Sequence, residues 1–279
     1  MPPVGFGGMP LSIDGRPTEA QGVRVVHAAL DAGVRLVDTA DVYCLADPDL
    51  GHNERLLAAA LRSWNGPRDE VLVATKGGLT RPDGRWERNA RPEHLRKACD
   101  RSLRALGVEQ IALYQLHAPD PRVPFAESVG MLAELQQEGK IRWVGLSNVS
   151  VDQVNAARRH VEVVTVQNRL SPFFREALTD GVVAHCERLG IGFLAYSPVG
   201  GGRLNLKLPG HPLVKAIAAR HGASPHTVVL AWVLAQGGNV FVIPGARTEA
   251  HATDSWQAGE LSLEADELRA LDAAHFDRS

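Results

Sequence analysis

One alternation recurs along the whole chain: a short run of β-branched or apolar residues, then a turn, then a longer amphipathic segment. This alternation predicts βα units and therefore a parallel sheet. Eight candidate strands follow the pattern: Val4–Met9, Arg35–Asp38, Val71–Thr75, Ile111–Leu116, Trp143–Leu146, Val163–Val166, Gly192–Ala195 and Val240–Ile243. Eight strands are typical of a (β/α)8 TIM barrel, a fold of about 250 residues. The chain has 279 residues, so we predict a single α/β barrel domain over residues 1–279.

Amphipathic segments between these strands predict the helices of the barrel. They are Glu19–Ala32, Glu54–Trp64, Pro92–Leu106, Phe125–Glu138, Val151–Arg159, Asp180–Leu189, Pro225–Ala235 and Glu264–His275, the last within a C-terminal helix and tail at 259–279. Asn53 and Ser224 are expected to cap helix N-termini, and Ser224 precedes a proline at the first helical position. Glycines expected just past helix ends, where a left-handed residue is favoured, are Gly33, Gly107, Gly139 and Gly190.

A doubly wound open sheet is the competing architecture. It would show a glycine-rich phosphate turn after the first strand and an acidic residue about 20 positions later. Here the glycines lie within or at the end of Val4–Met9, and Pro10 blocks an immediate helix. The barrel is therefore favoured. The longer irregular segments, Asp41–His52, Gly77–Arg91 and Val199–Pro212, each follow a predicted strand, on the face where barrel loops build the active site.

Composition excludes several classes of partner. The formal net charge is −2 and the isoelectric point is near 6.6, so we expect no nucleic-acid surface and no polybasic membrane anchor. We find no signal peptide and no apolar stretch of the roughly 18 residues that a membrane span needs. Cys44, Cys99 and Cys186 are odd in number and widely spaced, which favours free thiols in a reducing compartment. We expect a cytoplasmic protein, and the sequence leaves its oligomeric state undetermined.

Four polar residues lie where predicted strands end or just beyond: Asp38, Tyr43, Lys76 and His117. On a barrel they would converge at one mouth. Lys76 is expected to stabilise a Tyr43 phenolate and lower the pKa of Tyr43, while Asp38 keeps Lys76 protonated. His117 is expected to donate a hydrogen bond to a carbonyl oxygen. None of these groups supplies a hydride, so a cofactor must.

The acidic segment from Asp41 to Asp49 raises the alternative of a metal loop. It lacks a fixed ligand spacing and a glycine pivot, so a loop that shapes the pocket is favoured. A metal-dependent barrel hydrolase would need several His and Asp ligands at strand ends. Only Asp38 and His117 qualify, and we predict no metal site.

Five short motifs occur in a fixed order: Val37-Asp38-Thr39-Ala40-x-x-Tyr43, Ala74-Thr75-Lys76, Leu116-His117-x-Pro119-Asp120, Gly145-x-Ser147-Asn148 and Tyr196-Ser197-Pro198. Together they resemble successive motifs of the aldo-keto reductase superfamily, over about residues 4 to 255. The resemblance implies that Asp38, Tyr43, Lys76 and His117 form the catalytic tetrad. Tyr43 would then be the general acid in carbonyl reduction.

The resemblance also implies a nicotinamide site. Ser147 and Asn148 match the pair that binds the carboxamide, Gln167 adds to that contact, and Tyr196 matches the aromatic residue that stacks on the ring. The loop expected to follow the pyrophosphate comprises Ser197, Pro198, Val199, Gly200 and Gly201.

The segment after the eighth predicted strand resembles the site for the adenosine 2′-phosphate, and comprises Pro244, Gly245, Ala246, Arg247 and Thr248. The eighth strand would lead into a helix N-terminus, whose N–H groups favour an anion, and Arg247 could pair with the phosphate. This favours NADPH, with NADH as the alternative if Arg247 merely caps or solvates the turn. Asp254 and Ser255 stand where the family commonly places Glu-Asn to hold the adenine, and His251 stands where some members use a basic residue.

Two further features bear on the expected reaction. Met9, Trp86 and Asn148 are candidate substrate-pocket residues, and Met1 to Pro3 leave no room for the hairpin that usually plugs the barrel bottom. The bottom would then be more open, or stability would rely on the C-terminal helix. We expect NADPH-dependent reduction of an aldehyde or ketone, such as a small or sugar-like carbonyl compound. The alternatives are NAD(P)-dependent oxidation of a sugar or alcohol and a nicotinamide-sensing regulatory subunit.

Overall fold

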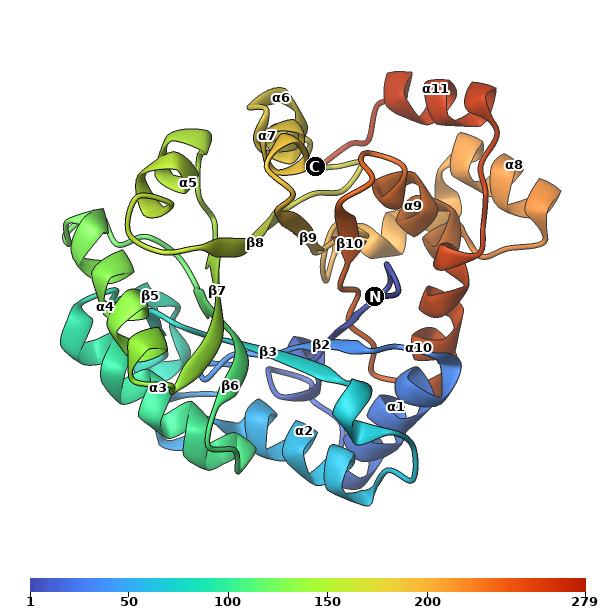
Figure 1. The fold of residues 1–279 in the computed structure, drawn as a ribbon. Helices are drawn as coiled ribbons and strands as arrows, with labels where there is room; N and C mark the ends of the chain where they lie inside the picture. Colours follow the sequence, from blue (N-terminus) through green and yellow to red (C-terminus); the bar gives the residue numbers. More distant parts are fainter.

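Eight parallel strands surround the centre of the molecule in the computed structural model, which describes residues 1–279 (Figure 1). In ring order they are β1 (Phe6–Gly7), β2 (Leu36–Asp38), β3 (Leu72–Gly77), β6 (Ile111–Leu116), β7 (Ile141–Ser147), β8 (Val163–Arg169), β9 (Gly192–Tyr196) and β10 (Val240–Val242). The ring closes where Val4 bridges to Val242 and the amide of Gly5 donates to the Val242 carbonyl at 2.8 Å. The predicted (β/α)8 barrel is confirmed.

The first strand is shorter than predicted. Its hydrogen bonding to β2 ends with the Gly8 N–H, which donates to the Asp38 carbonyl, because the chain then enters a short 3-10 helix at Met9–Leu11. Pro10 lies in the first turn of that helix, where its missing N–H costs nothing. Met9 is therefore directed into the loop layer at the mouth of the barrel rather than along the strand.

Helices cover the outside of the ring (Figure 1). They are α1 (Glu19–Ala32), α2 (His52–Ser63), α3 (Pro92–Leu106), α4 (Phe125–Gln137), α5 (Val151–Ala157), α6 (Glu176–Thr179), α7 (Val182–Arg188), α8 (Pro212–His221), α9 (Pro225–Leu234), α10 (Glu249–Trp256) and α11 (Ala265–Ala273). The helix predicted at Asp180–Leu189 is present as α7, which begins two residues later because Gly181 adopts a left-handed φ of 74°. The short helix α6 before it was not predicted. Helix α8 follows directly on a segment predicted to be irregular.

The predicted capping residues are confirmed except at one position, although several helices begin or end one or two residues from their predicted bounds. Ser224 accepts a hydrogen bond from the Thr227 amide and caps α9, and Gly33 and Gly107 follow α1 and α3. Asn53 is not an N-cap, because α2 begins one residue earlier, after Gly51.

The Asn53 side chain is instead buried between the first two strands. Its amide group donates to the Gly8 carbonyl and to Ser12 Oγ, each at 2.8 Å, and it accepts from Thr39 Oγ1 at 2.6 Å. A buried polar side chain with all these partners is stabilising rather than costly. Asn53 therefore ties the ends of β1 and β2 to the helix that follows the Tyr43 loop.

The cores are apolar on both sides of the sheet. A large cluster packs the outer helices against the strands, and a small one that includes Leu36, Leu113 and Leu194 fills the inside of the ring. The three cysteines Cys44, Cys99 and Cys186 are free and buried. Burial raises their thiol pKa values to about 11, 12 and 11, in that order. The predicted free thiols are confirmed.

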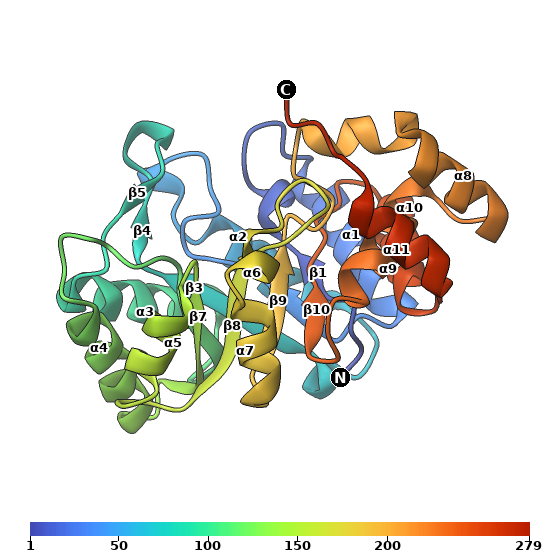
Figure 2. The same cartoon turned by 90° about the horizontal axis from the view of Figure 1, so that it is seen from above.

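The two ends of the barrel differ in what covers them (Figure 2). The end at which the strands finish carries the C-terminal tail and a small antiparallel hairpin of β4 (Leu79–Thr80) and β5 (Glu87–Arg88), inside a segment predicted to be irregular. The opposite end holds an open apolar pocket of about 430 Å³. Helix α11 packs against α8 and does not cover this pocket, so the more open bottom is the outcome that the structure supports.

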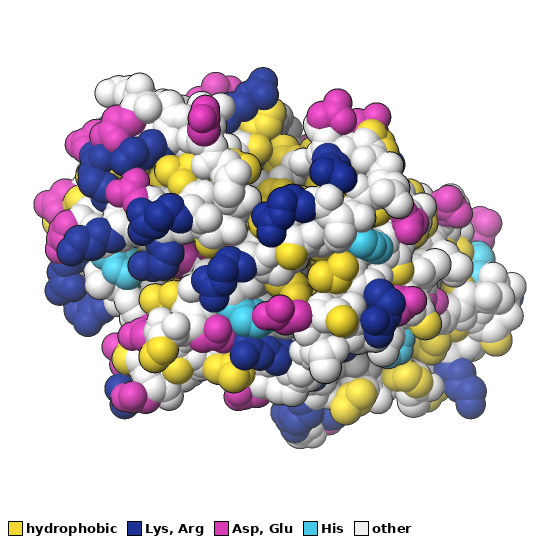
Figure 3. Space-filling model, turned by 90° about the horizontal axis from the view of Figure 1, so that it is seen from below, with side chains coloured by type: hydrophobic (Ala, Val, Ile, Leu, Met, Phe, Trp, Pro, Cys, Tyr) yellow, Lys and Arg dark blue, Asp and Glu magenta, His cyan; other side chains and the backbone are white.

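No helix of the structure is both long enough and apolar enough to cross a membrane. On the face drawn in Figure 3, acidic and basic side chains are interspersed. This distribution agrees with the nearly balanced net charge of −2.

Candidate active site

The four predicted catalytic residues meet at the mouth of the barrel. Asp38 ends β2, Lys76 is the next-to-last residue of β3, His117 follows β6, and Tyr43 lies on the loop after β2. Lys76 Nζ donates to Asp38 Oδ1 at 2.6 Å, to the Thr39 carbonyl at 2.8 Å and to Tyr43 Oη at 2.9 Å. The Tyr43 and His117 rings lie edge to face with centroids 5.8 Å apart. The sequence-predicted cluster is one physical site.

Lys76 is a charged residue that is almost completely buried from solvent. Its side chain is 1% exposed and that of Asp38 is 3% exposed. Burial alone disfavours the ammonium, but the Asp38 carboxylate and the Tyr43 hydroxyl outweigh it, so the pKa of Lys76 lies above its usual value. All three Nζ protons have acceptors, which is the condition for a buried ammonium to be tolerated. Lys76 is therefore a fixed positive charge next to Tyr43.

The expected direction of the Tyr43 pKa shift is wrong. Burial raises the pKa of Tyr43 above its usual value, and the attraction of Lys76, which does lower it as expected, only partly offsets the burial. The phenol is therefore protonated near neutral pH. A protonated phenol with a cation against its oxygen can give up its proton when a stronger acceptor arrives.

His117 is a neutral imidazole in this site. Burial and the nearby Lys76 charge together hold the pKa of His117 well below its usual value. Its Nδ1 atom is buried without a hydrogen-bond partner. A neutral ring with unused hydrogen-bonding capacity at the mouth can donate to a carbonyl oxygen without adding a second positive charge beside Lys76.

Two glutamine side chains orient the Asp38 carboxylate. Gln167 Nε2 donates to Asp38 Oδ2 at 2.8 Å, and Gln115 Nε2 donates to the same oxygen at 3.3 Å. Gln167 is also the residue predicted to contact the nicotinamide carboxamide, and in this structure its Nε2 group holds Asp38. Gln115 escaped the sequence analysis, although an uncharged polar residue inside the apolar strand Ile111–Leu116 was a signal that could have revealed it.

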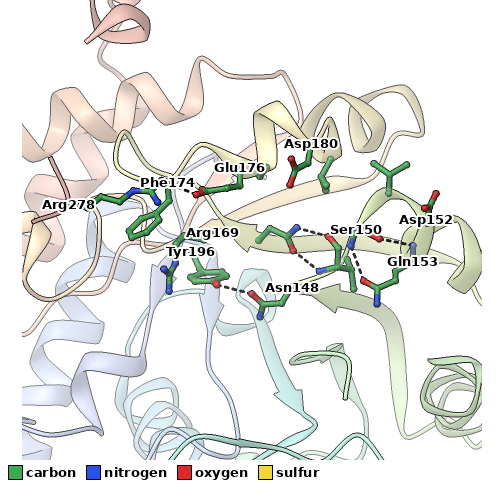
Figure 4. A pocket seen from close by; sticks show the side chains of 15 residues that line it. Asn148, Ser150, Asp152, Gln153, Arg169, Phe174, Glu176, Asp180, Tyr196 and Arg278 are labelled. Carbon is green, nitrogen blue, oxygen red and sulfur yellow. Dashed lines mark hydrogen bonds and ion pairs between the residues drawn. The ribbon is translucent and has the colours of Figure 1, made fainter. Parts of the chain in front are cut away.

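A second group of predicted residues lines a cleft of about 770 Å³ beside the tetrad (Figure 4). Tyr196 ends β9, and its hydroxyl donates to Asn148 Oδ1 at 2.8 Å. Asn148 Nδ2 donates to the His117 carbonyl at 2.9 Å and to Ser147 Oγ at 3.1 Å. Asn148 has a left-handed φ of 58°, a conformation that Asn adopts more readily than most residues. Asn148 thus links this cleft to the tetrad.

The loop Ser197–Gly201 turns sharply just after β9. Ser197, Gly200 and Gly201 all have positive φ, at 49°, 93° and 78°. A Cβ at Gly200 would lie 2.6 Å from the Phe173 ring, so only glycine fits there. Turns that mix right- and left-handed residues can direct backbone N–H groups at an anion, which is compatible with the pyrophosphate role expected of this loop.

Comparison with known proteins agrees with this geometry. The model of the Aldo/keto reductase family matches residues 3–275. This chain belongs to the aldo/keto reductase family. It is 33% identical to a probable aldo-keto reductase 1 of Glycine max, with 96% of this chain and 84% of that protein covered. The family membership confirms an oxidoreductase of carbonyl or alcohol substrates.

Two solved structures show the same fold along almost the whole reductase. A glycerol dehydrogenase of Gluconobacter oxydans is 30% identical with a TM-score of 0.82, covering 96% of this chain and 90% of that one. An aldo/keto reductase of Klebsiella pneumoniae in complex with NADP and acetate is 27% identical with a TM-score of 0.81, covering 98% of this chain and 90% of that one.

The predicted phosphate-binding segment of the reductase joins β10 to α10. Thr248 caps α10 by accepting from the His251 amide, so the predicted helix N-terminus is present. Arg247 donates to the carbonyls of Pro10 and Asp14, at 3.1 and 2.6 Å. Its exposed guanidinium is therefore already anchored to the loop after β1.

The residues expected near adenine lie on α10. His251 is exposed, and Ser255 is half-buried. Asp254 Oδ2 accepts from Ser224 Oγ at 2.6 Å, which occupies one carboxylate oxygen in holding the start of α9.

The predicted substrate-pocket residues lie around Tyr43. Trp86, in the β4–β5 hairpin, is 47% exposed and meets the Tyr43 ring edge to face at a centroid distance of 6.3 Å. The Arg81 guanidinium stacks on the Trp86 ring at 4.0 Å. Met9 packs against the small cluster that contains Tyr43. The hairpin therefore presents an aromatic surface next to the phenol.

A buried acidic pair behind the Tyr43 loop was missed by the sequence analysis. Asp41 and Glu54 are fully buried. Arg101 pairs with Asp41 at 2.5 Å, and Thr75 Oγ1 donates to Glu54 at 2.6 Å. Burial raises the pKa of Asp41 to about 6 and that of Glu54 to about 7, the latter helped by repulsion from Asp41.

The segment Asp41 to Asp49 forms no cluster of three or more potential metal ligands.

Proposed function

We propose that this reductase converts an aldehyde or ketone to an alcohol with NADPH, and that Tyr43 protonates the carbonyl oxygen. The observation that carries the proposal is the hydrogen-bonded chain from Tyr43 through Lys76 to Asp38, with contacts of 2.9 and 2.6 Å. Lysine and tyrosine at this distance are poised for proton transfer at the phenol oxygen. Their burial at 1% and 7% exposure strengthens that interaction.

The cleft beside the tetrad fits a nicotinamide cofactor. Tyr196 offers a partly exposed ring and Asn148 an amide group on the cleft wall. Ser147, which is hydrogen-bonded to Asn148, and the Ser197–Gly201 loop, which directly follows Tyr196 and has left-handed turns for the pyrophosphate, adjoin the cleft without lining it. The relatives from Klebsiella pneumoniae were solved with NADP and with NADPH. When bound, NADPH supplies the hydride for the carbonyl carbon.

The side chains of the reductase orient the reacting groups and transfer the proton. Lys76 stabilises negative charge at Tyr43 Oη as the phenol proton moves to the carbonyl oxygen. Asp38, held by Gln115 and Gln167, keeps the ammonium oriented toward Tyr43. Neutral His117 donates a hydrogen bond to the same carbonyl oxygen as charge develops there. The Trp86 hairpin excludes water from the Tyr43 side of the mouth.

The choice of NADPH over NADH rests on Arg247 and the start of α10. Arg247 is a cation at a helix N-terminus, a combination that favours a phosphate group. Two of its N–H groups hold backbone carbonyls, which pre-orders the side chain. We expect Arg247→Ala to weaken NADPH binding about tenfold or more and to leave NADH binding within twofold. Equal losses for both nucleotides, measured by fluorescence titration, would point to a purely structural role.

The decisive test of the reaction is Tyr43→Phe, which removes the hydroxyl and keeps the ring. We expect turnover on an accepted carbonyl to fall by about a thousandfold or more, because general acid catalysis is lost. The dissociation constant for NADPH should change by less than threefold. Wild-type turnover in this variant would exclude Tyr43 as the proton donor.

A further inference from the structure

Arg169 is the last residue of β8 and therefore lies at the mouth end of the barrel. Side chains on a strand alternate between faces, so Arg169 shares its face with Gln167, whose side chain reaches inward to Asp38. Arg169 lies two residues beyond Gln167 along the strand, which places it about 7 Å nearer the rim of the barrel. Its strand neighbour in register is Tyr196. Arg169 therefore lies next to Tyr196, the residue proposed to stack on the nicotinamide ring.

The Arg169 guanidinium is held by rings and not by acids. It lies 4.4 Å from the centroid of the Phe174 ring and 5.6 Å from that of Tyr196. The side chain makes no hydrogen bond and no ion pair. Stacking covers the flat face of a guanidinium and leaves its N–H edge available to an acceptor. The two rings therefore fix the orientation of the Arg169 guanidinium, while its N–H groups have no hydrogen-bond partner in the protein.

No acidic group of the cleft forms an ion pair with Arg169. Against the effect of burial, the pKa of Glu176 is lowered by its hydrogen bond with Arg278 and by the charges of Arg278 and Arg169. Glu176 is paired with Arg278 at 2.9 Å. Asp152 lies at the opposite end of the cleft from Arg169, and Asp180 lies between the two (Figure 4). An anion entering the cleft would therefore meet Arg169 at one end and repulsion at the other.

We propose that Arg169 binds an anionic group, a phosphate or a carboxylate, of the small molecules that enter this cleft. The inference rests on the proposed function, because it takes the cleft to be the site of cofactor and substrate. Two sources present this chemistry: the pyrophosphate of the dinucleotide, and a carboxylate on the carbonyl substrate. A charged fork of N–H donors at this place would select a carbonyl compound with an acidic group if the substrate is the source.

The experiment compares Arg169→Gln and Arg169→Lys with a matched control, Arg142→Gln. Arg142 also stacks on an aromatic ring, Trp143 at 4.2 Å, and also has no ion pair, but it lies at the start of β7, at the other end of the barrel. Nucleotide binding is measured by NADPH fluorescence titration. Carbonyl binding is measured by calorimetry on the NADP-loaded protein, which cannot reduce it, with 4-carboxybenzaldehyde and the uncharged 4-methylbenzaldehyde.

If the dinucleotide is the source, Arg169→Gln raises the dissociation constant of NADPH about tenfold or more. If the substrate is the source, NADPH binding is unchanged and the dissociation constant of 4-carboxybenzaldehyde rises by a similar factor, while that of 4-methylbenzaldehyde stays within twofold. In either case Arg169→Lys should lose less, because it keeps the charge and loses only the fork.

The proposal is overturned if Arg169→Gln binds both anionic probes as tightly as Arg142→Gln does. These measurements need no turnover, so a wild-type protein that binds NADPH and reduces no carbonyl would refute the proposed reaction alone. A wild-type protein that binds neither probe would refute both proposals.

Discussion

The two ends of this barrel are built from the same strands and are chemically opposite. Strand β3 begins with Leu72 in the apolar pocket at the bottom and reaches Lys76 in the tetrad at the mouth. The bottom pocket has mostly apolar walls, including Leu113 and Trp143, and no charged side chain. The mouth buries a full ion pair between Lys76 and Asp38.

The contrast shows where stability and chemistry are kept apart. Apolar burial stabilises the fold wherever it occurs, whereas a buried ion pair gains little net stability after its desolvation. The polar groups at the mouth therefore serve the reaction and add little net stability, whereas the apolar groups at the bottom stabilise the fold and take no part in the reaction. Variants at the two ends should separate activity from stability.

Lys76→Met should have the largest effect. It removes the cation beside Tyr43, so turnover should fall by about a thousandfold or more. It also leaves the Asp38 carboxylate buried without its partner, which typically costs about 3–5 kcal/mol of unfolding free energy. Steady-state kinetics and urea unfolding measure the two effects.

The double variant Asp38→Asn with Lys76→Met separates these two effects. It removes both charges, so most of the lost unfolding free energy should return while turnover remains absent. A double variant that is as unstable as the single one would show that packing, and not the unpaired charge, explains the loss.

At the bottom, Leu113→Ala should reverse the pattern. Leu113 is 3% exposed inside the ring, and its truncation should cost about 2–4 kcal/mol of unfolding free energy. Turnover per folded molecule should stay within twofold of wild type, because Leu113 lines the bottom pocket and makes no contact with the polar groups of the tetrad. A tenfold loss of turnover with normal stability would break the separation between the two ends.

Glu54→Gln tests the acidic pair that supports the mouth. Burial raises the folded pKa of Glu54 to about 7, above the usual 4.5 of a glutamate, so between these values the folded protein holds a proton that the unfolded chain has released. This contribution to stability is present at low pH and is lost as the pH rises through about 7. Between pH 5 and 8 the melting temperature of the wild type should fall by roughly 5 °C relative to the variant.

The comparison with Glu54→Gln also cancels the opposite trend from histidines. His52, His94 and His226 have pKa values lowered by burial, so they lose stability as the pH falls. Their effect is common to both proteins. Parallel melting curves across pH 5 to 8 would mean that Glu54 is ionised in the folded state throughout.

Trp86→Ala should have the smallest effect. Trp86 is half exposed and touches Tyr43 only by its edge, so we expect the KM of an aromatic aldehyde to rise about three- to fivefold, equivalent to roughly 1 kcal/mol. The matching change at the bottom, Trp143→Ala, should leave the KM unchanged. A KM change of similar size for both variants would show that Trp86 acts through general stability.

The barrel and the tetrad were predictable because both depend on local pattern. Hydrophobic periodicity places Asp38, Lys76 and His117 at strand ends, and parallel strands bring their ends to one face of the sheet. The helix α8 also carried a signal, with Pro212 at its start and Gly222 just past its end, but no element was predicted between the irregular segment Val199–Pro212 and the helix Pro225–Ala235.

Other features depend on tertiary position that no local pattern encodes. Asn53 was mistaken for a cap because its partners, Gly8, Ser12 and Thr39, are distant in sequence. The pKa of Tyr43 was misjudged because burial, which outweighs Lys76, is a property of the packed mouth. Likewise, Arg247 can donate hydrogen bonds to two backbone carbonyls only because the first and last βα units meet in the closed barrel.

The three buried thiols give the protein an internal unfolding reporter. Cys44, Cys99 and Cys186 belong to different parts of the barrel, on the Tyr43 loop, on α3 and on α7. Only a thiolate is reactive, so in the native state each sulfur is shielded both by packing and by its raised pKa. An alkylating reagent added to the native reductase should therefore modify each sulfur at the rate at which its own part of the molecule opens. Mass spectrometry of the three peptides would then yield three local opening rates from one unmodified protein.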